Sequence, residues 1–137
     1  MRLCANTGSQ LHLIHPLGFE LDDKRMRRAG LDYIDWNHVQ QHASYVECLK
    51  NISYRRMFAC STKGTQAYAQ VNFEPGDAFL FGPETRGLPA EILAEFAPQC
   101  ILRIPMLASS RSINLSNATA IFLFEAWRQN NFAGTEY

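Results

Sequence analysis

The sequence predicts an α/β fold in which a mostly parallel sheet is flanked by helices. Short apolar runs alternate with helical patterns along the whole chain, as in sheets whose parallel strands are joined by crossover helices. Most of these runs stop at a glycine, a proline or a polar cluster, which is where strands turn into loops. The chain has 137 residues, 47% of them hydrophobic, which suits a single domain over 1–137 with a dense core.

The first elements are defined by their ends. A helix is predicted to stop at Thr7, because Gly8 fits the left-handed conformation that closes many helices. The apolar run 11–14 predicts a short strand, which Pro16 closes.

Two further helices are predicted before the middle of the chain. A helix is predicted over 23–29, because Asp22 and Asp23 supply an N-cap and a negative first turn and the segment ends in basic residues, so its charges suit both ends of a helix dipole. Residues 33–39 fit neither a helical nor a strand pattern. Ser44 is a favourable N-cap, and we expect a helix over 44–50.

Strand and helix patterns alternate more clearly in the second half of the chain. Strands are predicted over 56–60, 78–81 and 101–104, and helices over 91–96 and 114–129. Pro89 stands where a first-turn proline is tolerated in the shorter helix. The longer helix is almost wholly apolar from residue 118 to 126, so we expect most of its circumference to be buried.

Polar loops follow three of the predicted strands, at 61–64, 82–88 and 105–112. The carboxyl ends of parallel strands meet at one edge of a sheet, so these loops can converge on one small molecule. Gly82 and Gly87 would allow the backbone to approach it closely or to adopt a positive φ. The alternative is an ordinary strand–turn–helix connection, in which Glu84 and Arg86 form a surface ion pair.

The segment 109–117 places hydroxyl and amide side chains directly before the apolar helix. Ser112 or Asn114 can cap that helix, but capping needs only one of them. Surplus polar side chains remain at Ser109, Ser110, Ser116 and Asn117. We expect Asn117 to lie near buried surface, where a ligand or a second subunit would satisfy its hydrogen bonds.

Several functions are disfavoured. The chain lacks the Gly-x-Gly-x-x-Gly and Walker patterns of nucleotide sites and the Gly-x-Ser-x-Gly elbow of hydrolases. No apolar run approaches the roughly 18 residues of a membrane span, and the first residues lack the apolar stretch of a signal peptide. We therefore expect a cytoplasmic protein with no membrane association.

Metal and disulfide chemistry are not expected. The four cysteines are widely spaced and form no Cys-x-x-Cys pair. The four histidines show no catalytic or metal-binding pattern, and His12 and His15 are interpreted as packing or edge residues of a strand.

The basic residues cluster locally, although the formal net charge is zero. A zero net charge argues against binding nucleic acid by bulk electrostatics. The cluster 24–28 has a simple alternative, a solvated helix face. Further basic residues stand near loop or helix ends, a placement that suits contacts with a few phosphates: Arg2, Lys63, Arg86 and Arg111.

Several segments together resemble one known family. They are 80–89, 104–106, 109–117 and 125–129, with 4–8, 17–19, 22–33 and 62–64. In combination they resemble the SPOUT superfamily of methyltransferases, and within it the TrmL/YibK family of small tRNA (cytidine/uridine-34)-2′-O-methyltransferases. The resemblance extends from Arg2 to about residue 134, essentially the whole chain.

The resemblance implies a SPOUT-type fold with a C-terminal trefoil knot, an exception to the rule that chains do not thread loops. It also implies a homodimer and S-adenosyl-L-methionine as the cofactor. The family's cofactor contacts, many from the main chain, would fall on Cys60, Gly82, Ile104 and Ser112, with Thr62, Glu84, Leu88, Met106 and Leu115 lining the pocket. Cys60 stands where relatives carry leucine.

The implied reaction transfers a methyl group to the ribose 2′-hydroxyl of the wobble nucleotide 34, in the anticodon loop of leucine tRNAs. Positioning and removal of the hydroxyl proton would supply most of the catalysis. Arg2 matches the family's arginine near that hydroxyl. Because arginine stays protonated, we expect it to orient and stabilise the oxygen rather than to take its proton.

The chain also departs from the family pattern at its start. The family begins with an apolar strand and a Pro-x-Asn-x-Gly-Asn-x-x-Arg segment, of which only the final arginine is present. Without that strand, its neighbours would expose unpaired backbone groups. If the chain starts at Met1, we expect weak stability and little activity; a comparison with a chain extended upstream would test this.

Two alternatives remain. One is a SPOUT methyltransferase acting at another tRNA position or on rRNA. The other is a non-catalytic RNA-binding remnant of such an enzyme. Titration with S-adenosylmethionine separates the enzymes from the remnant, and nucleoside analysis separates the two enzymes.

Overall fold

The computed structural model describes residues 1–17 and 37–136. The chain divides into two compact units, Met1–Ser53 and Tyr54–Tyr137, which are described one at a time. The predicted helix over 23–29 and the basic cluster 24–28 lie outside the described residues. None of the helices in the described ranges is long and apolar enough to cross a membrane.

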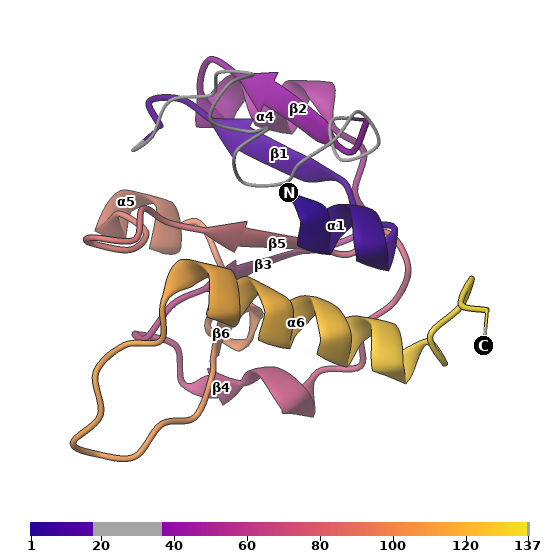
Figure 1. The fold of residues 1–137 in the computed structure, drawn as a ribbon. Helices are drawn as coiled ribbons and strands as arrows, with labels where there is room; N and C mark the ends of the chain where they lie inside the picture. Colours follow the sequence, from indigo (N-terminus) through magenta and orange to yellow (C-terminus); the bar gives the residue numbers. More distant parts are fainter. Residues whose placement is uncertain (18–36, 137) are drawn as a thin grey trace. The chain divides into compact units, whose positions relative to one another are not determined.

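In its described residues, 1–17 and 37–53, the first unit contains a pair of parallel strands and two short helices (Figure 1). These elements are α1 (Arg2–Thr7), β1 (Leu11–Ile14), β2 (Val39–His42) and α4 (Tyr45–Asn51). Helix α1 ends as predicted at Gly8, which has a φ of 69°. The predicted cap of α4 is also confirmed, because the Ser44 side chain accepts a 3.2 Å hydrogen bond from the backbone N–H of Glu47.

Strand β2 was not predicted from the sequence. Its four residues, Val-Gln-Gln-His, include only one strongly apolar side chain, so no strand pattern is visible. The strand forms because it pairs in parallel with β1, with Leu11 opposite Val39 and Ile14 opposite His42. A partner far away in the sequence therefore determines this element.

The second unit is built on a four-stranded parallel sheet with the strand order β4-β6-β3-β5. Its strands are β3 (Met57–Cys60), β4 (Gln66–Ala67), β5 (Ala78–Phe81) and β6 (Ile101–Arg103). The three longer strands confirm the predicted ones to within a residue. The two-residue strand β4 was not predicted; it forms through its pairing with β6, with Gln66 opposite Leu102.

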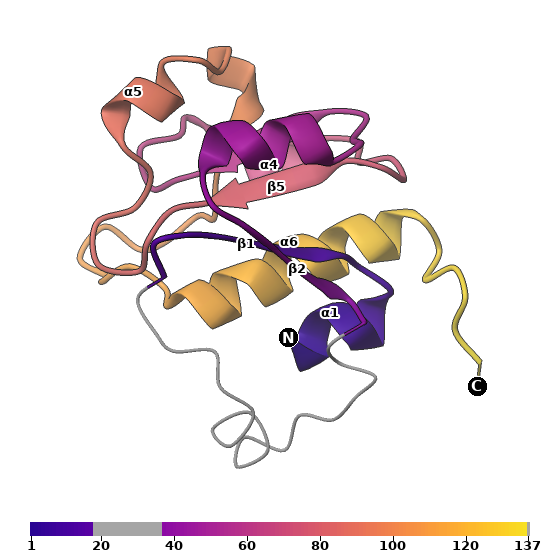
Figure 2. The same ribbon diagram turned by 90° about the horizontal axis from the view of Figure 1, so that it is seen from above.

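Two helices accompany this sheet, α5 (Ala90–Leu93) and α6 (Leu115–Gln129). Short 3-10 turns occupy Tyr68–Gln70 and Pro98–Cys100. Helix α5 is shorter than the predicted 91–96, and Pro89 precedes it as the N-cap. Both views show α5 beyond the carboxyl end of β5, at the end from which the loop toward α6 also leaves (Figure 1, Figure 2).

The alternation of side chains along β3 sorts the core into two clusters. Phe58 lies in one cluster with Leu102 and Phe122, whereas Ala59 lies in the other with Leu88 and Leu93. Successive residues of a strand face opposite sides of a sheet, so α6 covers one side through Phe122 and α5 covers the other through Leu93.

The Phe122 side of the core is dense and aromatic, as predicted. Phe122 lies 5.4 Å from Phe79, 5.6 Å from Phe81 and 5.6 Å from Tyr68 between ring centroids. Most of these rings meet edge to face, an arrangement that adds to the stabilisation from burial.

Helix α6 differs from the prediction in its burial. Among its described side chains only Phe122 is fully buried, and Phe124 is 45% exposed. The expectation that most of its circumference is buried is therefore wrong for the single chain. The helix packs on the sheet along one side only, so the apolar side chains on its other side keep contact with solvent.

A polar contact ties the C-terminal end of α6 to the segment before β5. The Gln129 side-chain oxygen accepts a 2.7 Å hydrogen bond from the backbone N–H of Phe73, and its amide donates to the Val71 carbonyl at 3.0 Å. The same amide donates to Glu125, 3.0 Å away. Gln129 therefore satisfies backbone groups beside the buried Phe73 ring.

We expect Gln129→Ala to lower the free energy of unfolding by about 1–3 kcal/mol, because it leaves these backbone groups unpaired. Urea denaturation of the purified protein measures the change. The matched control is Gln99→Ala, since Gln99 is exposed and surface substitutions cost within about 0.5 kcal/mol. Equal stability of the two variants would contradict the role given to Gln129.

Glu125 should make stability depend on pH in acid. Hydrogen bonds from Arg128 and Gln129 lower the pKa of Glu125 from 4.5 to about 2. A carboxyl with a lowered pKa in the folded state stabilises the fold above its ordinary pKa, and this contribution is lost as the pH falls from 4.5 toward 2. Because Arg128 is 60% exposed, solvent screening limits the contribution to about 1 kcal/mol.

Denaturation of the wild type and of Glu125→Gln across this pH range tests the effect. We expect the wild type to be more stable near neutral pH and the difference to shrink toward pH 2. A difference that stays constant with pH would contradict the lowered pKa.

Candidate functional site

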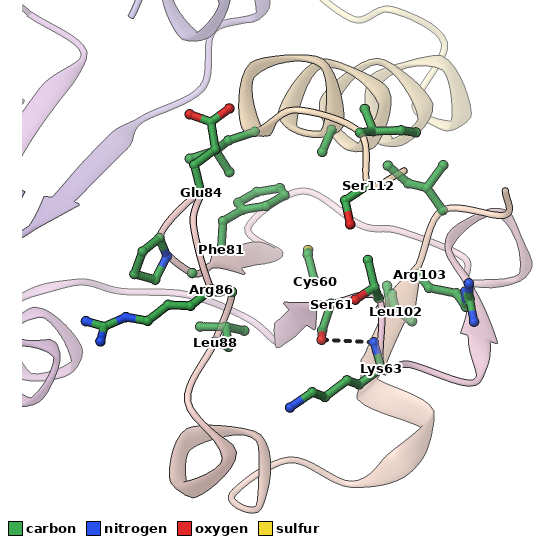
Figure 3. A pocket seen from close by; sticks show the side chains of 18 of the residues that line it. Cys60, Ser61, Lys63, Phe81, Glu84, Arg86, Leu88, Leu102, Arg103 and Ser112 are labelled. Atoms are coloured by element: carbon green, nitrogen blue, oxygen red, sulfur yellow. Dashed lines mark hydrogen bonds between the residues drawn. The ribbon is translucent and has the colours of Figure 1, made fainter. Parts of the chain in front are cut away.

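A pocket of about 320 Å³ opens in the second unit, where the loops after β3, β5 and β6 meet (Figure 3). It lies within the size range of small-molecule sites. The loops at 61–63 and 82–88 and the segment 102–106 contribute lining residues, together with Ser112 and the first turns of α6. The predicted convergence of three polar loops at one edge of the sheet is therefore confirmed.

All nine residues to which the resemblance assigned the cofactor line this single pocket. They are Cys60, Thr62, Gly82, Glu84, Leu88, Ile104, Met106, Ser112 and Leu115. Further lining residues were not identified from the sequence as pocket residues, notably Phe81, Leu102, Arg103 and Phe122. Phe122 gave no signal, because a phenylalanine within an apolar helix looks like any core residue. Arg103, the only charged residue of its predicted strand, was a usable signal.

The loop 82–88 forms one wall of the pocket through its backbone. Its turn is closed by a 2.8 Å hydrogen bond from the Gly87 N–H to the Pro83 carbonyl, and Gly87 has a φ of 68°. A Cβ atom on Gly82 would lie 2.2 Å from the Gly87 carbonyl carbon and from the Leu88 nitrogen. The two ends of the loop are in contact only because residue 82 has no side chain.

The loop after β3 is held in a similar way. The Ser61 N–H donates to the Leu102 carbonyl at 2.9 Å, and the Ser61 hydroxyl accepts from the Lys63 N–H at 3.1 Å (Figure 3). A Cβ atom on Gly64 would lie 2.6 Å from the carbonyl oxygen of Ile101. This loop therefore lies directly against β6.

The polar segment before α6 divides into a cap and an exposed remainder. Asn114 is the N-cap, and its side chain accepts a 2.8 Å hydrogen bond from the Asn117 N–H. Ser112 points into the pocket (Figure 3). The Asn117 side chain is exposed in the single chain, so the expectation that it lies near buried surface is wrong. It belongs to the side of the first turn that faces away from the sheet.

The pocket combines an apolar interior with a charged rim. Leu88 and Leu102 are buried, and burial raises the pKa of the Cys60 thiol well above 9.0. That thiol is therefore neutral and donates a weak, 3.9 Å hydrogen bond to the Phe58 carbonyl. The site does not present Cys60 as a thiolate nucleophile.

Charged side chains from several segments surround this interior. Lys63, Arg86 and Arg103 extend toward the periphery, and Glu84 is the acidic lining residue (Figure 3). In the described part of the chain no ion pair joins Glu84 to Arg86. The sequence left two alternatives for Glu84 and Arg86, a surface ion pair or contact with a ligand. The geometry favours contact with a ligand. An apolar interior with a mixed-charge rim suits an organic ligand that carries both positive and negative groups. The basic side chains of the rim also suit an anionic molecule bound beside that ligand.

The remaining predicted residues lie elsewhere. Arg2 is in α1 of the first unit, and Arg111 is exposed next to Ser112. The sequence indicated no clustering of the histidines, but His12 and His42 are in direct contact, with 2.9 Å between Nδ1 and Nε2, and their potential ligand atoms lie within 4.8 Å of that of Cys48. Thirty residues separate the two histidines in the sequence, so only the pairing of β1 with β2 reveals the contact.

Comparisons with known proteins show which family this chain resembles. Residues 1–124 match the SpoU rRNA Methylase family. A tRNA (cytidine(34)-2′-O)-methyltransferase of Saccharophagus degradans is 56% identical over 136 residues, which cover 99% of this chain and 88% of the relative.

Solved structures show the same likeness. One, described as giving insights into the 2-OH methylation of C/U34 on tRNA, has a TM-score of 0.82 and 43% identity, covering 95% of this chain and 80% of that one. The AdoMet-bound rRNA methyltransferase of Sinorhizobium meliloti has a TM-score of 0.71 and 25% identity, covering 93% of this chain and 49% of that one. By its family match, its relatives and its fold, this chain belongs to the SpoU rRNA methylase family of SPOUT methyltransferases.

Proposed function

We propose that this protein is a tRNA 2′-O-ribose methyltransferase that uses S-adenosyl-L-methionine to methylate the wobble nucleotide 34, a cytidine or modified uridine. The observation that carries the proposal is the convergence of all nine residues assigned to the cofactor on one pocket. Relatives at 52–56% identity are tRNA (cytidine(34)-2′-O)-methyltransferases, which supports the choice of substrate.

The pocket residues fit S-adenosylmethionine. Gly82 keeps the backbone of one wall close together, and Leu88 and Leu102 give the interior an apolar surface. Polar groups at Thr62, Glu84 and Ser112 can accept or donate hydrogen bonds at the edges. When bound, the cofactor supplies an electrophilic methyl group on its sulfonium.

The side chains of this chain then position the acceptor hydroxyl and stabilise the charge that develops on it. We assign that role to Arg2, by its match to the family arginine. A guanidinium stays protonated, so it can orient the ribose oxygen and stabilise negative charge as the hydroxyl loses its proton. Burial raises the pKa of the Cys60 thiol, so we assign it no role as a nucleophile.

The basic residues at the pocket rim would hold the tRNA. Lys63, Arg86 and Arg103 come from three different segments of one edge, and contacts of this kind bind phosphates without reading the sequence. We further propose leucine tRNAs as the substrates, because the family resemblance implies them.

The oligomeric state and chain topology are also part of the proposal. A homodimer is supported by the apolar side chains that α6 leaves partly exposed, with Phe124 45% exposed. We propose that residues 1–137 form one domain with a C-terminal trefoil knot, as the resemblance implies, and the family match spans both compact units. Because the substrate is tRNA, we place the reaction in the cytoplasm. We assign no metal ion to the methyl transfer itself.

A second function is favoured by one observation. The matching family is named for rRNA methylation, so a different RNA position is the alternative target. It would use the same pocket and differ in the RNA contacts.

We expect Arg103→Ala to raise the KM for tRNA at least several-fold and to change S-adenosylmethionine affinity much less, because the Arg103 side chain extends toward the periphery of the pocket and a lost phosphate contact weakens RNA binding. The matched control is Arg55→Ala. Arg55 pairs with Glu74 at the surface, is 61% exposed and is not among the pocket-lining residues. If both variants bind tRNA like the wild type, the rim does not contact the RNA as proposed.

Calorimetric titration with S-adenosylmethionine, with and without tRNA, tests the proposed function. We expect one S-adenosylmethionine molecule to bind per chain and the affinity for tRNA to change when the cofactor is bound. Tight tRNA binding without any cofactor binding would instead identify a non-catalytic RNA-binding protein.

A further inference from the structure

Two histidines and a cysteine converge in the first unit, and none of them is among the residues that line the proposed cofactor pocket. The parallel register places His12 opposite Gln40 and Ile14 opposite His42. Residues 12 and 14 share one face of β1, so His12 and His42 project from the same face of the strand pair. Helix α4 contacts both strands, and Cys48 is its buried residue (Figure 1).

The three side chains bring their potential ligand atoms together. His12 Nδ1 and His42 Nε2 are 2.9 Å apart, and with Cys48 Sγ they all lie within 4.8 Å of one another. His42 is 5% exposed and Cys48 4% exposed, whereas His12 is half-buried. Solvent therefore reaches the cluster mainly from the His12 side.

We propose that His12, His42 and Cys48 form a binding site for a zinc-class divalent metal ion. Two imidazole nitrogens and one thiolate sulfur are the ligand types that Zn²⁺ prefers, whereas Mg²⁺ and Ca²⁺ select oxygen. These three atoms leave one position of a tetrahedron for a water molecule or another ligand. The proposed methyl transfer does not involve a metal ion at this position.

The distances fit tetrahedral coordination after small movements. Bond lengths of about 2.0–2.1 Å to nitrogen and 2.3 Å to sulfur place two nitrogens about 3.3 Å apart and nitrogen and sulfur about 3.6 Å apart. The observed 2.9 Å between the nitrogens must open by a few tenths of an ångström. The cysteine sulfur must approach by at most about 1.2 Å from the limit of 4.8 Å, which side-chain rotation can supply.

Binding also requires a balanced transfer of protons. The Cys48 thiol releases its proton to solvent and becomes a thiolate ligand. The imidazole that donates the hydrogen bond between the rings moves its proton to its other nitrogen, so that both facing nitrogens present lone pairs. The metal ion then replaces the hydrogen bond between His12 and His42.

A metal ion at this cluster would have a structural role, because its three ligands come from three different elements. Two of the three, His42 and Cys48, are among the buried residues of the described part of this unit. A metal here would join β1, β2 and α4.

Cobalt(II) titration of the metal-free protein tests the site. Cobalt occupies zinc sites and, when bound to a thiolate, gives a sulfur-to-metal charge-transfer absorption. We expect this absorption to saturate at one ion per chain and to be displaced by Zn²⁺. Cys48→Ala should abolish it, and His12→Ala should weaken cobalt affinity at least tenfold. The matched control is Cys4→Ala, because Cys4 is equally buried in the same unit but is not among the three clustered residues.

The wild-type spectrum decides the proposal without relying on any variant. Absence of a charge-transfer band in the wild type would overturn it and leave a hydrogen bond between His12 and His42 beside the Cys48 thiol. A band that persists in a folded Cys48→Ala variant, or that disappears in a folded Cys4→Ala variant, would also overturn it. Far-UV circular dichroism establishes the folding of each variant.

Discussion

Gly82→Ala is expected to weaken S-adenosylmethionine binding by about 100-fold or more, equivalent to about 2.7 kcal/mol. The added Cβ would lie 2.2 Å from two backbone atoms of Gly87 and Leu88 and 2.6 Å from the Gly87 oxygen. Backbone cannot rotate away as a flexible side chain can, so the loop 82–88 must shift. That loop is a wall of the proposed cofactor pocket, and methyl transfer should be lost together with binding.

Calorimetric titration with the cofactor measures this change, and thermal denaturation shows whether the variant is folded. The matched control is Gly8→Asn. Gly8 also has a positive φ, 69°, but no atom lies within 4 Å of the position of its Cβ, and asparagine tolerates this conformation. Wild-type affinity in a folded Gly82→Ala variant would show that the cofactor does not bind against this wall.

Arg2→Ala is expected to reduce the rate of methyl transfer by about 100- to 1,000-fold, the usual cost of removing a group that stabilises an oxyanion. Cofactor affinity should change little, because Arg2 is not among the residues that line the pocket. Single-turnover methylation of a leucine tRNA transcript measures the rate, and titration measures the affinity. A lower methyl-transfer rate with unchanged cofactor affinity would distinguish the role of Arg2 in the reaction from the role of Gly82 in cofactor binding.

Arg2→Lys serves as the conservative comparison. Lysine keeps the positive charge but lacks the planar fork of the guanidinium, so we expect partial recovery of the rate. If Arg2→Ala transfers methyl groups at the wild-type rate, the assignment of Arg2 to the ribose hydroxyl is wrong.

The sequence predicted the elements that carry their own local signal. The apolar runs before Ser61 and Gly82 and after Cys100 became β3, β5 and β6. The polar loops that follow them meet at one pocket, because parallel strands present their carboxyl ends at a common edge. Ser44 and Gly8 marked helix ends correctly, since capping depends on the residue and its immediate neighbours.

The features that depend on distant partners were missed. Strands β2 and β4 form by pairing with β1 and β6 rather than by their own composition. The contact between His12 and His42 depends on the same pairing. Phe122 lines the pocket because the first half of α6 passes beside it, and the exposure of Phe124 follows from packing on one side of that helix alone.

Nucleoside mass spectrometry of leucine tRNAs most directly tests the claim that this protein methylates the wobble ribose. The tRNAs would be isolated from a strain lacking the gene and from the same strain carrying either the wild-type gene or Gly82→Ala. We expect 2′-O-methylation at nucleotide 34 to disappear in the deletion strain, to return with the wild-type gene and to remain absent with Gly82→Ala. Persistent methylation of nucleotide 34 in the deletion strain, or loss of a methyl group only at another RNA position, would contradict the account.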